Sequence, residues 1–171
     1  MKKIFTVLFL LIVILSSYAQ EFNRTIDDPK LKKEVLIGYC TKEGLFEHGF
    51  NKYFDKYYES YQFVPEYIDA INTILDGIQI VVIMADWCED SHREIPRFYK
   101  IMDHLVYPQE EITLICVNSK KETEDVPIES YKIEKVPTFI FVKDGKEIGR
   151  ITEKPKESLE KDMLDLLKTD K

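Results

Sequence analysis

Hydrophobic and polar positions form two helical patterns in the first half of the chain. Beyond Thr41, aromatic residues recur one, three or four positions apart, which is typical of the buried face of an amphipathic helix. A second helix is predicted with Pro65 in its first turn and an end at Asp76-Gly77. Packing against a sheet is a commoner use of an aromatic face than lining a ligand groove, so we assign this face to the core. The aromatic residues are Phe46, Phe50, Tyr53, Phe54, Tyr57, Tyr58 and Tyr61.

After residue 77 the pattern alternates between strands and helices. Residues 78–85 are nearly all apolar, as expected of a central strand covered on both faces. Buried strands are also predicted at 112–117 and 138–142, and a tight turn at Asp144-Gly145 leads into a last strand at 147–152. Helices are predicted between the first two strands, where Pro96 should introduce a kink, and at the end of the chain. This alternation favours an α/β fold with a parallel sheet and crossover helices.

The first residues of the chain have the pattern of a secretory signal peptide. Lys2 and Lys3 precede an apolar stretch over residues 4–15, and Ser17-Tyr18-Ala19 provides small residues at the two positions that a signal peptidase reads. A membrane anchor is the alternative, but the stretch is well short of the roughly 20 residues that span a bilayer. We therefore predict cleavage before Gln20, a secreted or periplasmic protein, and no stable membrane insertion afterwards.

Length and charge limit the classes of function. A chain of 171 residues with 44% hydrophobic and 32% charged content is long enough for one compact domain. Loss of the two lysines with residues 1–19 changes the formal net charge from -7 to about -9. An acidic domain without a basic stripe is a poor candidate for binding nucleic acid or anionic lipid. We expect a polar, extended lead-in over residues 20–33 and a domain over 34–171, with a helical extension at 34–77 and a core at 78–168.

The cysteine count indicates a reactive thiol. Cys40, Cys88 and Cys116 make an odd number, so in an oxidising compartment at least one is free or is paired with another molecule. Cys88 is our candidate. Cys116 lies in a predicted buried strand and is expected to be a core thiol, whereas Cys40 is either a resolving thiol or a small apolar residue at a helix start. The scattered histidines, His48, His92 and His104, do not form a metal-ligand cluster, and we predict no metal or cofactor.

Cys88 lies at the predicted junction between the apolar strand and the following helix, within Trp87-Cys88-Glu89-Asp90-Ser91. The unpaired N–H groups of a helix N-terminus favour a thiolate. His92 and Arg93 should favour it as well, while Glu89 and Asp90 should oppose it. Ser91 has two interpretations that the sequence leaves open. It caps the helix in a capping box with Glu94, or it donates a hydrogen bond to the Cys88 thiolate.

Three signals together resemble the thioredoxin superfamily: Ala85-Asp86-Trp87-Cys88, Pro96 and Val136-Pro137-Thr138, in the family's order and spacing between residues 78 and 168. The resemblance implies a thioredoxin fold, a central mixed sheet flanked by helices, here with an N-terminal helical extension. It also implies that Trp87 flanks the active thiol and that Pro137 follows a cis peptide bond beside it, with Val136 in the substrate groove. The segment around Cys88 further resembles an exported bacterial subgroup with a Trp-Cys-x-Asp-Ser motif.

Two departures from the family pattern change the expected chemistry. Ser91 stands where the second cysteine of the Cys-x-x-Cys pair is usual, and Val82 stands where the family places a buried acid. A thiol without a neighbouring partner forms a mixed disulfide that a separate thiol must release. We therefore predict monothiol exchange with Cys88 as the nucleophile and Ser91 beside it, acting on disulfide-containing proteins or a small thiol. The alternative is a redox-inactive module that binds a peptide or partner in the groove.

Overall fold

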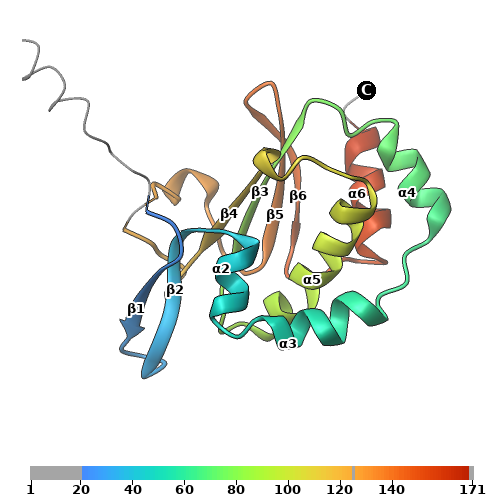
Figure 1. Ribbon diagram of the computed structural model, residues 1–171. Helices are drawn as coiled ribbons and strands as arrows, with labels where there is room; N and C mark the ends of the chain where they lie inside the picture. Colours follow the sequence, from blue (N-terminus) through green and yellow to red (C-terminus); the bar gives the residue numbers. More distant parts are fainter. Residues whose placement is uncertain (1–20, 125, 170–171) are drawn as a thin grey trace, which may run out of the picture.

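The computed structural model describes residues 21–124 and 126–169. The predicted signal peptide lies outside these residues. In the described part, six strands form one mixed sheet in the order β1-β2-β4-β3-β5-β6 (Figure 1). β3 and β4 are parallel, and the other neighbouring strands are antiparallel. The strands are β1 (Arg24–Asp28), β2 (Lys33–Cys40), β3 (Ile78–Met84), β4 (Ile112–Cys116), β5 (Thr138–Lys143) and β6 (Lys146–Thr152).

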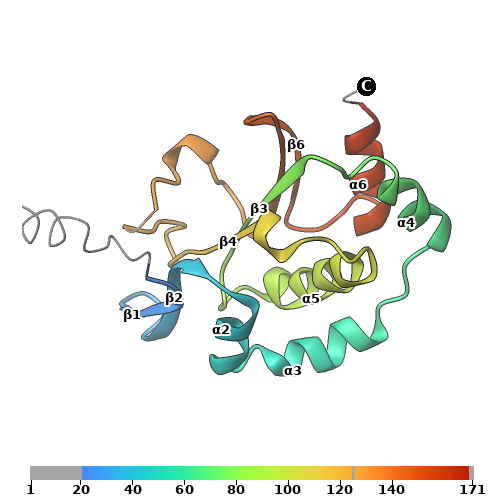
Figure 2. The same cartoon turned by 45° about the horizontal axis from the view of Figure 1, so that its top comes forward.

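Helices cover one face of this sheet. Figures 1 and 2 both show α4, α5 and α6 on the same side of β3, β5 and β6. Side chains from this face and from the helices form the larger hydrophobic core, in which Phe98, Phe139 and Phe141 are fully buried. The helices are α2 (Lys42–Glu47), α3 (Asn51–Tyr53), the π-helical turn η1 (Phe54–Tyr58), α4 (Pro65–Asn72), α5 (Glu89–His104) and α6 (Leu159–Lys168).

The connector between β4 and β5 covers the other face. It contains one 3₁₀ turn, η3 (Glu129–Tyr131), and a second 3₁₀ turn, η2 (Gln109–Glu111), precedes β4. Val126, Ile128 and Val136 of the connector pack against Ile83 and Ile140 of the sheet in a second, smaller core. The sheet is therefore buried on both sides, which explains why its central strands are continuous apolar runs.

The predicted mixed α/β architecture is confirmed, with a central sheet flanked by helices. The predicted strands after residue 77 are present, and Asp144 and Gly145 form the turn between β5 and β6 with φ values of 48° and 73°. Positive φ at both central residues is the geometry of a type I′ hairpin turn. In the described part of the chain, no helix is both long and apolar enough to span a bilayer.

The single aromatic helix predicted after Thr41 is wrong. α2 begins as expected, with the Thr41 side chain accepting a hydrogen bond from the Gly44 N–H at 3.0 Å. It ends at Glu47, because Gly49 adopts a left-handed φ of 74° and the Phe50 N–H bonds back to the Leu45 carbonyl at 3.0 Å. This is a Schellman stop, after which the aromatic pattern continues in α3 and η1.

The N-terminal region also differs from the expected extended lead-in and helical extension. β1 and β2 form an antiparallel hairpin that adds two strands to the sheet before the first helix begins. Asp28, at its turn, accepts hydrogen bonds from the backbone N–H groups of Lys30 and Leu31 and from the backbone and hydroxyl of Ser119. Desolvation opposes the Asp28 charge, but these hydrogen bonds prevail and lower its pKa to about 2. The hairpin is thereby tied to the connector that follows β4.

Candidate active site

Cys88 is the N-cap residue of α5, and its extended backbone (φ -92°, ψ 127°) leads from the end of β3 into the helix. The turn is closed by a hydrogen bond from the Cys88 N–H to the Ala85 carbonyl at 3.2 Å, and the first helical bond runs from the His92 N–H to the Cys88 carbonyl at 2.9 Å. The sulfur is therefore attached to the residue that caps the N-terminus of a 16-residue helix. Such a position favours negative charge because the first backbone N–H groups have no partner within the helix.

The Cys88 thiol lies against the loop that carries Pro137. Its Sγ donates a hydrogen bond to the Val136 carbonyl at 3.3 Å, and the Val136–Pro137 peptide bond is cis, as the family resemblance implies. The cysteine is half-buried, whereas Val136 and Pro137 are buried. The structure thus brings together the two sequence signals, 48 residues apart, on which the active-site hypothesis depends.

Ser91 has neither of the two contacts that the sequence suggested. The helix begins before Ser91, so the capping-box prediction is wrong, and the Glu94 carboxylate instead binds Arg93 at 2.6 Å and Arg97 at 3.2 Å. The buried Ser91 hydroxyl accepts a hydrogen bond from the Ala85 N–H at 3.3 Å. Its position therefore stabilises the turn that presents Cys88.

The basic residues beside Cys88 are engaged elsewhere. His92 donates from Nε2 to the Asp86 carbonyl at 2.7 Å, and its ring stacks on Tyr53 with 3.7 Å between ring centroids. Burial lowers the pKa of His92 below its usual 6.5, which favours the neutral imidazole. Arg93 forms an ion pair with Asp90 at 2.5 Å and with Glu94. The expected support of the thiolate is therefore weakened at both residues, because His92 favours its neutral form and the charge of Arg93 is paired with two carboxylates.

Trp87 is fixed by its ring nitrogen, which donates to the Val117 carbonyl at 3.1 Å. Both Trp87 and Cys88 pack as partly buried residues against the smaller core, which also contains Val136. The indole and the thiol therefore pack against the same cluster of the sheet, and the loop of the cis proline contacts the thiol. Trp87, Val136 and Pro137 are the residues predicted from the sequence to line a substrate groove.

Asp86 is a residue of the site region that sequence reasoning missed. Its Oδ2 accepts a hydrogen bond from the Leu36 N–H of β2 at 3.2 Å, while its buried Oδ1 has no hydrogen-bond partner in the described part of the chain. Burial raises the pKa of the Asp86 carboxyl above its usual 3.8. The sequence signal for it was an acidic residue directly after a buried strand. The site thus has a carboxyl group two residues before Cys88, whereas the family's buried acid would stand at Val82.

The other two cysteines lie away from this site. Cys116 is fully buried in the larger core, as predicted, and burial raises the pKa of its thiol well above the usual value. Cys40 belongs to that same core on the helix-covered face, whereas Cys88 packs against the opposite face. The structure therefore does not support Cys40 as the thiol that resolves a Cys88 adduct within one molecule.

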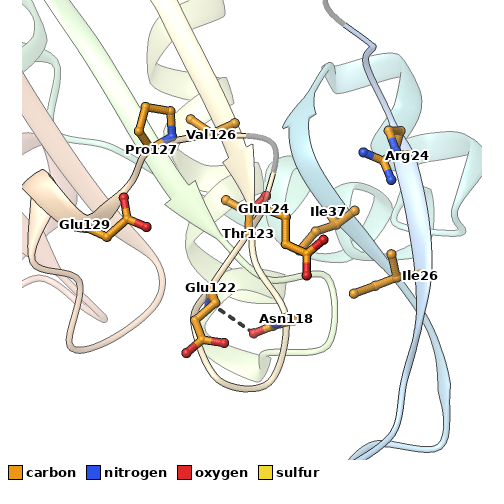
Figure 3. Close-up of a pocket in the computed structure, with 10 residues that line it drawn as sticks. All are labelled: Arg24, Ile26, Ile37, Asn118, Glu122, Thr123, Glu124, Val126, Pro127 and Glu129. Atoms are coloured by element: carbon orange, nitrogen blue, oxygen red, sulfur yellow. Dashed lines mark hydrogen bonds between the residues drawn. The ribbon is translucent and has the colours of Figure 1, made fainter.

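A surface cavity of 630 Å³ lies next to the connector, between Arg24 and Ile26 of β1, Ile37 of β2 and the residues that follow β4 (Figure 3). Three glutamates, Glu122, Glu124 and Glu129, give it an acidic rim. Val126, in its lining, belongs to the smaller core that also holds Trp87 and Cys88. In residues 21–124 and 126–169, no cluster of three potential metal-ligating side chains is found.

Comparison with known proteins identifies the family to which the chain belongs. The sequence profile of the thioredoxin family, described as "Thioredoxin", matches residues 49–168, a range that includes Cys88, Ser91 and Pro137. This chain belongs to the thioredoxin family. Its membership indicates thiol–disulfide redox function at the level of the family. The matched range excludes β1, β2 and α2.

Individual relatives agree with this assignment. The chain is 30% identical to a thioredoxin of Chlamydia pneumoniae over 78 residues, which are 46% of this chain and 71% of the relative. It is 29% identical to a thioredoxin of Chlamydia trachomatis over 89 residues, 52% of this chain and 81% of the relative. A crystal structure of a protein of unknown function from Pseudomonas aeruginosa matches 73% of this chain and 85% of its own, with a TM-score of 0.52 and 16% identity. This last similarity concerns the fold alone.

Proposed function

We propose that this protein is an exported, monothiol member of the thioredoxin family that exchanges disulfides through a mixed disulfide on Cys88. The observation that supports this most strongly is the position of the Cys88 Sγ, at the N-cap of α5 and 3.3 Å from the Val136 carbonyl. A thiol there has a helix N-terminus to stabilise its thiolate. It also has an adjacent backbone segment, at a cis proline, along which an extended client can lie.

The proposed reaction has two steps. The Cys88 thiolate attacks one sulfur of a client disulfide, a new bond forms between Cys88 and that sulfur, and the second client sulfur leaves as a thiolate that takes a proton from water. A thiolate from a small thiol, or from another cysteine of the client, then attacks the mixed disulfide and restores the Cys88 thiolate. Cys88 ends in its initial oxidation state, so the net result is exchange or isomerisation of the client disulfide.

Ser91 determines which second step is available. In a Cys-x-x-Cys site the second cysteine attacks the mixed disulfide from the next turn of the helix. Here that position holds a buried hydroxyl bonded to the Ala85 N–H, which is not a nucleophile for a disulfide. The adduct on Cys88 should therefore be long-lived, which suits an isomerase or a protein that retains its clients.

The test is to trap the adduct. Purified protein is mixed with insulin, a disulfide-bonded model client, and quenched with acid, and adducts are separated on a non-reducing gel and identified by mass. We expect an adduct with the wild type and with Cys40→Ala, whose thiol lies on the other face of the sheet. We expect none with Cys88→Ala. An adduct that persists in Cys88→Ala, or its absence from the wild type, would contradict the proposal.

A second candidate function is a redox-inactive module that holds a peptide beside Trp87 and Pro137. The ion pairs of Arg93 favour this function, because a guanidinium that is paired with carboxylates stabilises a thiolate less. Val82 favours it as well, because the family places a buried acid at that position. The two functions differ in the reactivity of Cys88. If the thiol is alkylated near neutral pH no faster than the thiol of glutathione, after correction for exposure, the binding module is the better description. Clearly faster alkylation supports exchange.

Export is a separate part of the proposal and rests on residues 1–19. Expression of the full chain in a bacterium with an intact secretion system should yield a mature protein outside the cytoplasm that begins at Gln20. Intact-mass measurement of the purified protein checks this. Retention of the first 19 residues would point to an anchored form instead.

A further inference from the structure

We propose that Cys40 and Cys116 form a disulfide bond in the oxidised protein, tying the N-terminal hairpin to the family core. Their placement in the sheet is the first observation. In the β2–β4 ladder Gly38 lies opposite Cys116, and Cys40 lies opposite Leu114. The two cysteines are therefore diagonal neighbours on the same face of the sheet. Gly38, directly across from Cys116, has no side chain to separate them.

The surroundings of the two thiols are the second observation. Both side chains belong to the same buried cluster, and the Cys40 Sγ donates a hydrogen bond at 3.6 Å to the carbonyl of Gly38, the residue that lies opposite Cys116. Cys40 is also among the groups that raise the pKa of Cys116. Diagonal neighbours of an antiparallel pair lie about 7–8 Å apart, slightly beyond the roughly 4.4–6.8 Å between the Cα atoms of a disulfide. The bond therefore requires β2 and β4 to approach each other slightly at their short ladder.

Access to the pair comes from one side only. Cys116 is fully buried, whereas Cys40 is 4% exposed and lines a surface cavity of 460 Å³ together with Tyr39, Thr41 and Tyr99. A small disulfide can reach Cys40 through this cavity, while the Cys116 thiolate is disfavoured in the folded state, since burial, Cys40 and Asp86 raise its pKa. We therefore place bond formation during folding, before the core closes.

The chemistry balances with an external disulfide as the oxidant. Cys40 attacks a small-molecule disulfide such as oxidised glutathione and displaces one glutathione thiolate. The Cys116 thiolate then attacks the Cys40 sulfur and displaces the second. Two protein thiols are oxidised by two electrons, one disulfide is reduced, and the two protons end on the two glutathione molecules. The product leaves Cys88 as the one unpaired thiol of the three, which accounts for the odd cysteine count.

The bond would strengthen the junction between the added hairpin and the family core. β2 and β4 share only three register pairs, from Gly38 to Cys40. A link from residue 40 to residue 116 closes a long loop of the unfolded chain, and the stabilisation from a crosslink grows with loop length. β2 also holds Asp86 through the Leu36 N–H, so a firmer junction fixes the strand that supports the active-site turn.

The test uses Cys88→Ala, so that its outcome does not depend on exchange at the active site. The variant is unfolded with reductant, refolded in a reduced and oxidised glutathione buffer, quenched with acid, alkylated and digested with trypsin. We expect residues 34–42, with Cys40, to be joined to residues 101–120, with Cys116. Recovery of both peptides as alkylated monomers, or with glutathione attached to each, overturns the proposal.

A stability measurement provides the second readout. The oxidised Cys88→Ala protein should melt about 5–15 °C above its reduced form, as expected for a disulfide in a domain of this size. The same comparison in a Cys88→Ala/Cys40→Ala double variant should show no dependence on oxidation. Equal melting temperatures of the oxidised and reduced Cys88→Ala protein contradict the proposal, even if the linked peptides are found. The disulfide would then have formed in a non-native state of the chain.

Discussion

The three sulfurs of this protein occupy two environments that differ in almost every respect. Cys88 is half-buried at a helix N-terminus, and its hydrogen bond goes to a backbone carbonyl in a loop. Cys40 and Cys116 lie inside the sheet as diagonal neighbours, where burial holds the pKa of Cys116 well above its usual range. The side-chain chemistry is identical in all three. Position in the fold alone separates a candidate nucleophile from a candidate structural link.

The largest expected effect is a difference in alkylation rate between the two environments. In the reduced, folded protein at about pH 7, iodoacetamide should modify Cys88 about 1,000-fold faster than Cys116, because Cys116 reacts only when the core opens. Quenched time courses read by peptide mass measure both rates in one sample. Comparable rates for the two thiols would mean that the sheet does not protect Cys116 and that the two environments do not differ in reactivity.

A new thiol at position 91 should sharpen the difference between monothiol and dithiol chemistry. Ser91→Cys supplies an intramolecular nucleophile for the mixed disulfide, and we expect insulin reduction with dithiothreitol to accelerate by about tenfold or more. Turbidity of the precipitating insulin chains gives the rate. Ser91→Ala is the matched control, since it removes the hydroxyl without adding a thiol. An unchanged rate in Ser91→Cys would show that resolution does not limit turnover.

The hydroxyl of Ser91 should prove more important for stability than for thiol chemistry. Ser91→Ala leaves the buried Ala85 N–H without its acceptor, so we expect the free energy of unfolding to fall by about 1–3 kcal/mol. Urea titration of wild type and variant in reductant measures this change. In the same variant, alkylation of Cys88 should slow by no more than about threefold. A large loss of reactivity without a loss of stability would restore the alternative in which Ser91 supports the thiolate directly.

Asp86 is near Cys88 in the sequence and is one of the groups that raise the pKa of Cys116. The smallest expected effect is the change in stability when its charge is removed. Because burial raises its folded pKa above 3.8, the folded state binds its proton more tightly than the unfolded chain does. Its contribution to stability is fully present below the unfolded pKa and is lost as pH rises through the folded value. Asp86→Asn keeps an acceptor for the Leu36 N–H without a charge. It should therefore raise the melting temperature near neutral pH by a few degrees.

The control for Asp86→Asn is the same pair of melts in acid, at about pH 3.5, where most of the Asp86 carboxyl is protonated in both states. There the advantage of the variant should disappear. A variant that is less stable than wild type at neutral pH would show that the charged carboxylate has a favourable partner in solution.

The sequence predicted the family core well because its signals are local or strongly periodic. Apolar runs gave the central strands, Asp144-Gly145 gave the hairpin, and the motif around Cys88 together with Pro137 gave the two sides of the site. The N-terminal hairpin was missed because β1 has a mixed polar composition and its pairing with β2 depends on tertiary contacts such as Asp28 with Ser119. The break after α2 is not visible in the aromatic spacing, because Phe46 and Phe50 are four residues apart and the helical pattern continues across Gly49.

The details of the site could not be predicted for a different reason. Whether Ser91 caps the helix depends on where the helix begins, and a shift of one turn changes its partner from Glu94 or Cys88 to the Ala85 N–H. The directions of His92 and Arg93 depend on Tyr53 and Asp90, one of which belongs to a distant element. Sequence spacing identifies these residues but does not identify which neighbour each one contacts.

The hairpin at the start of the described chain also affects how copies of the protein meet one another. β2 contains Val35, Leu36 and Ile37, all buried, and without β1 its backbone would form the open edge of the sheet. Open apolar edges recruit strands from other molecules and promote aggregation. β1 takes that place with the sequence Arg24-Thr25-Ile26-Asp27-Asp28, whose charges discourage edge-to-edge pairing. β1, at the edge of the sheet, therefore reduces the tendency of copies of the protein to aggregate through their sheet edges.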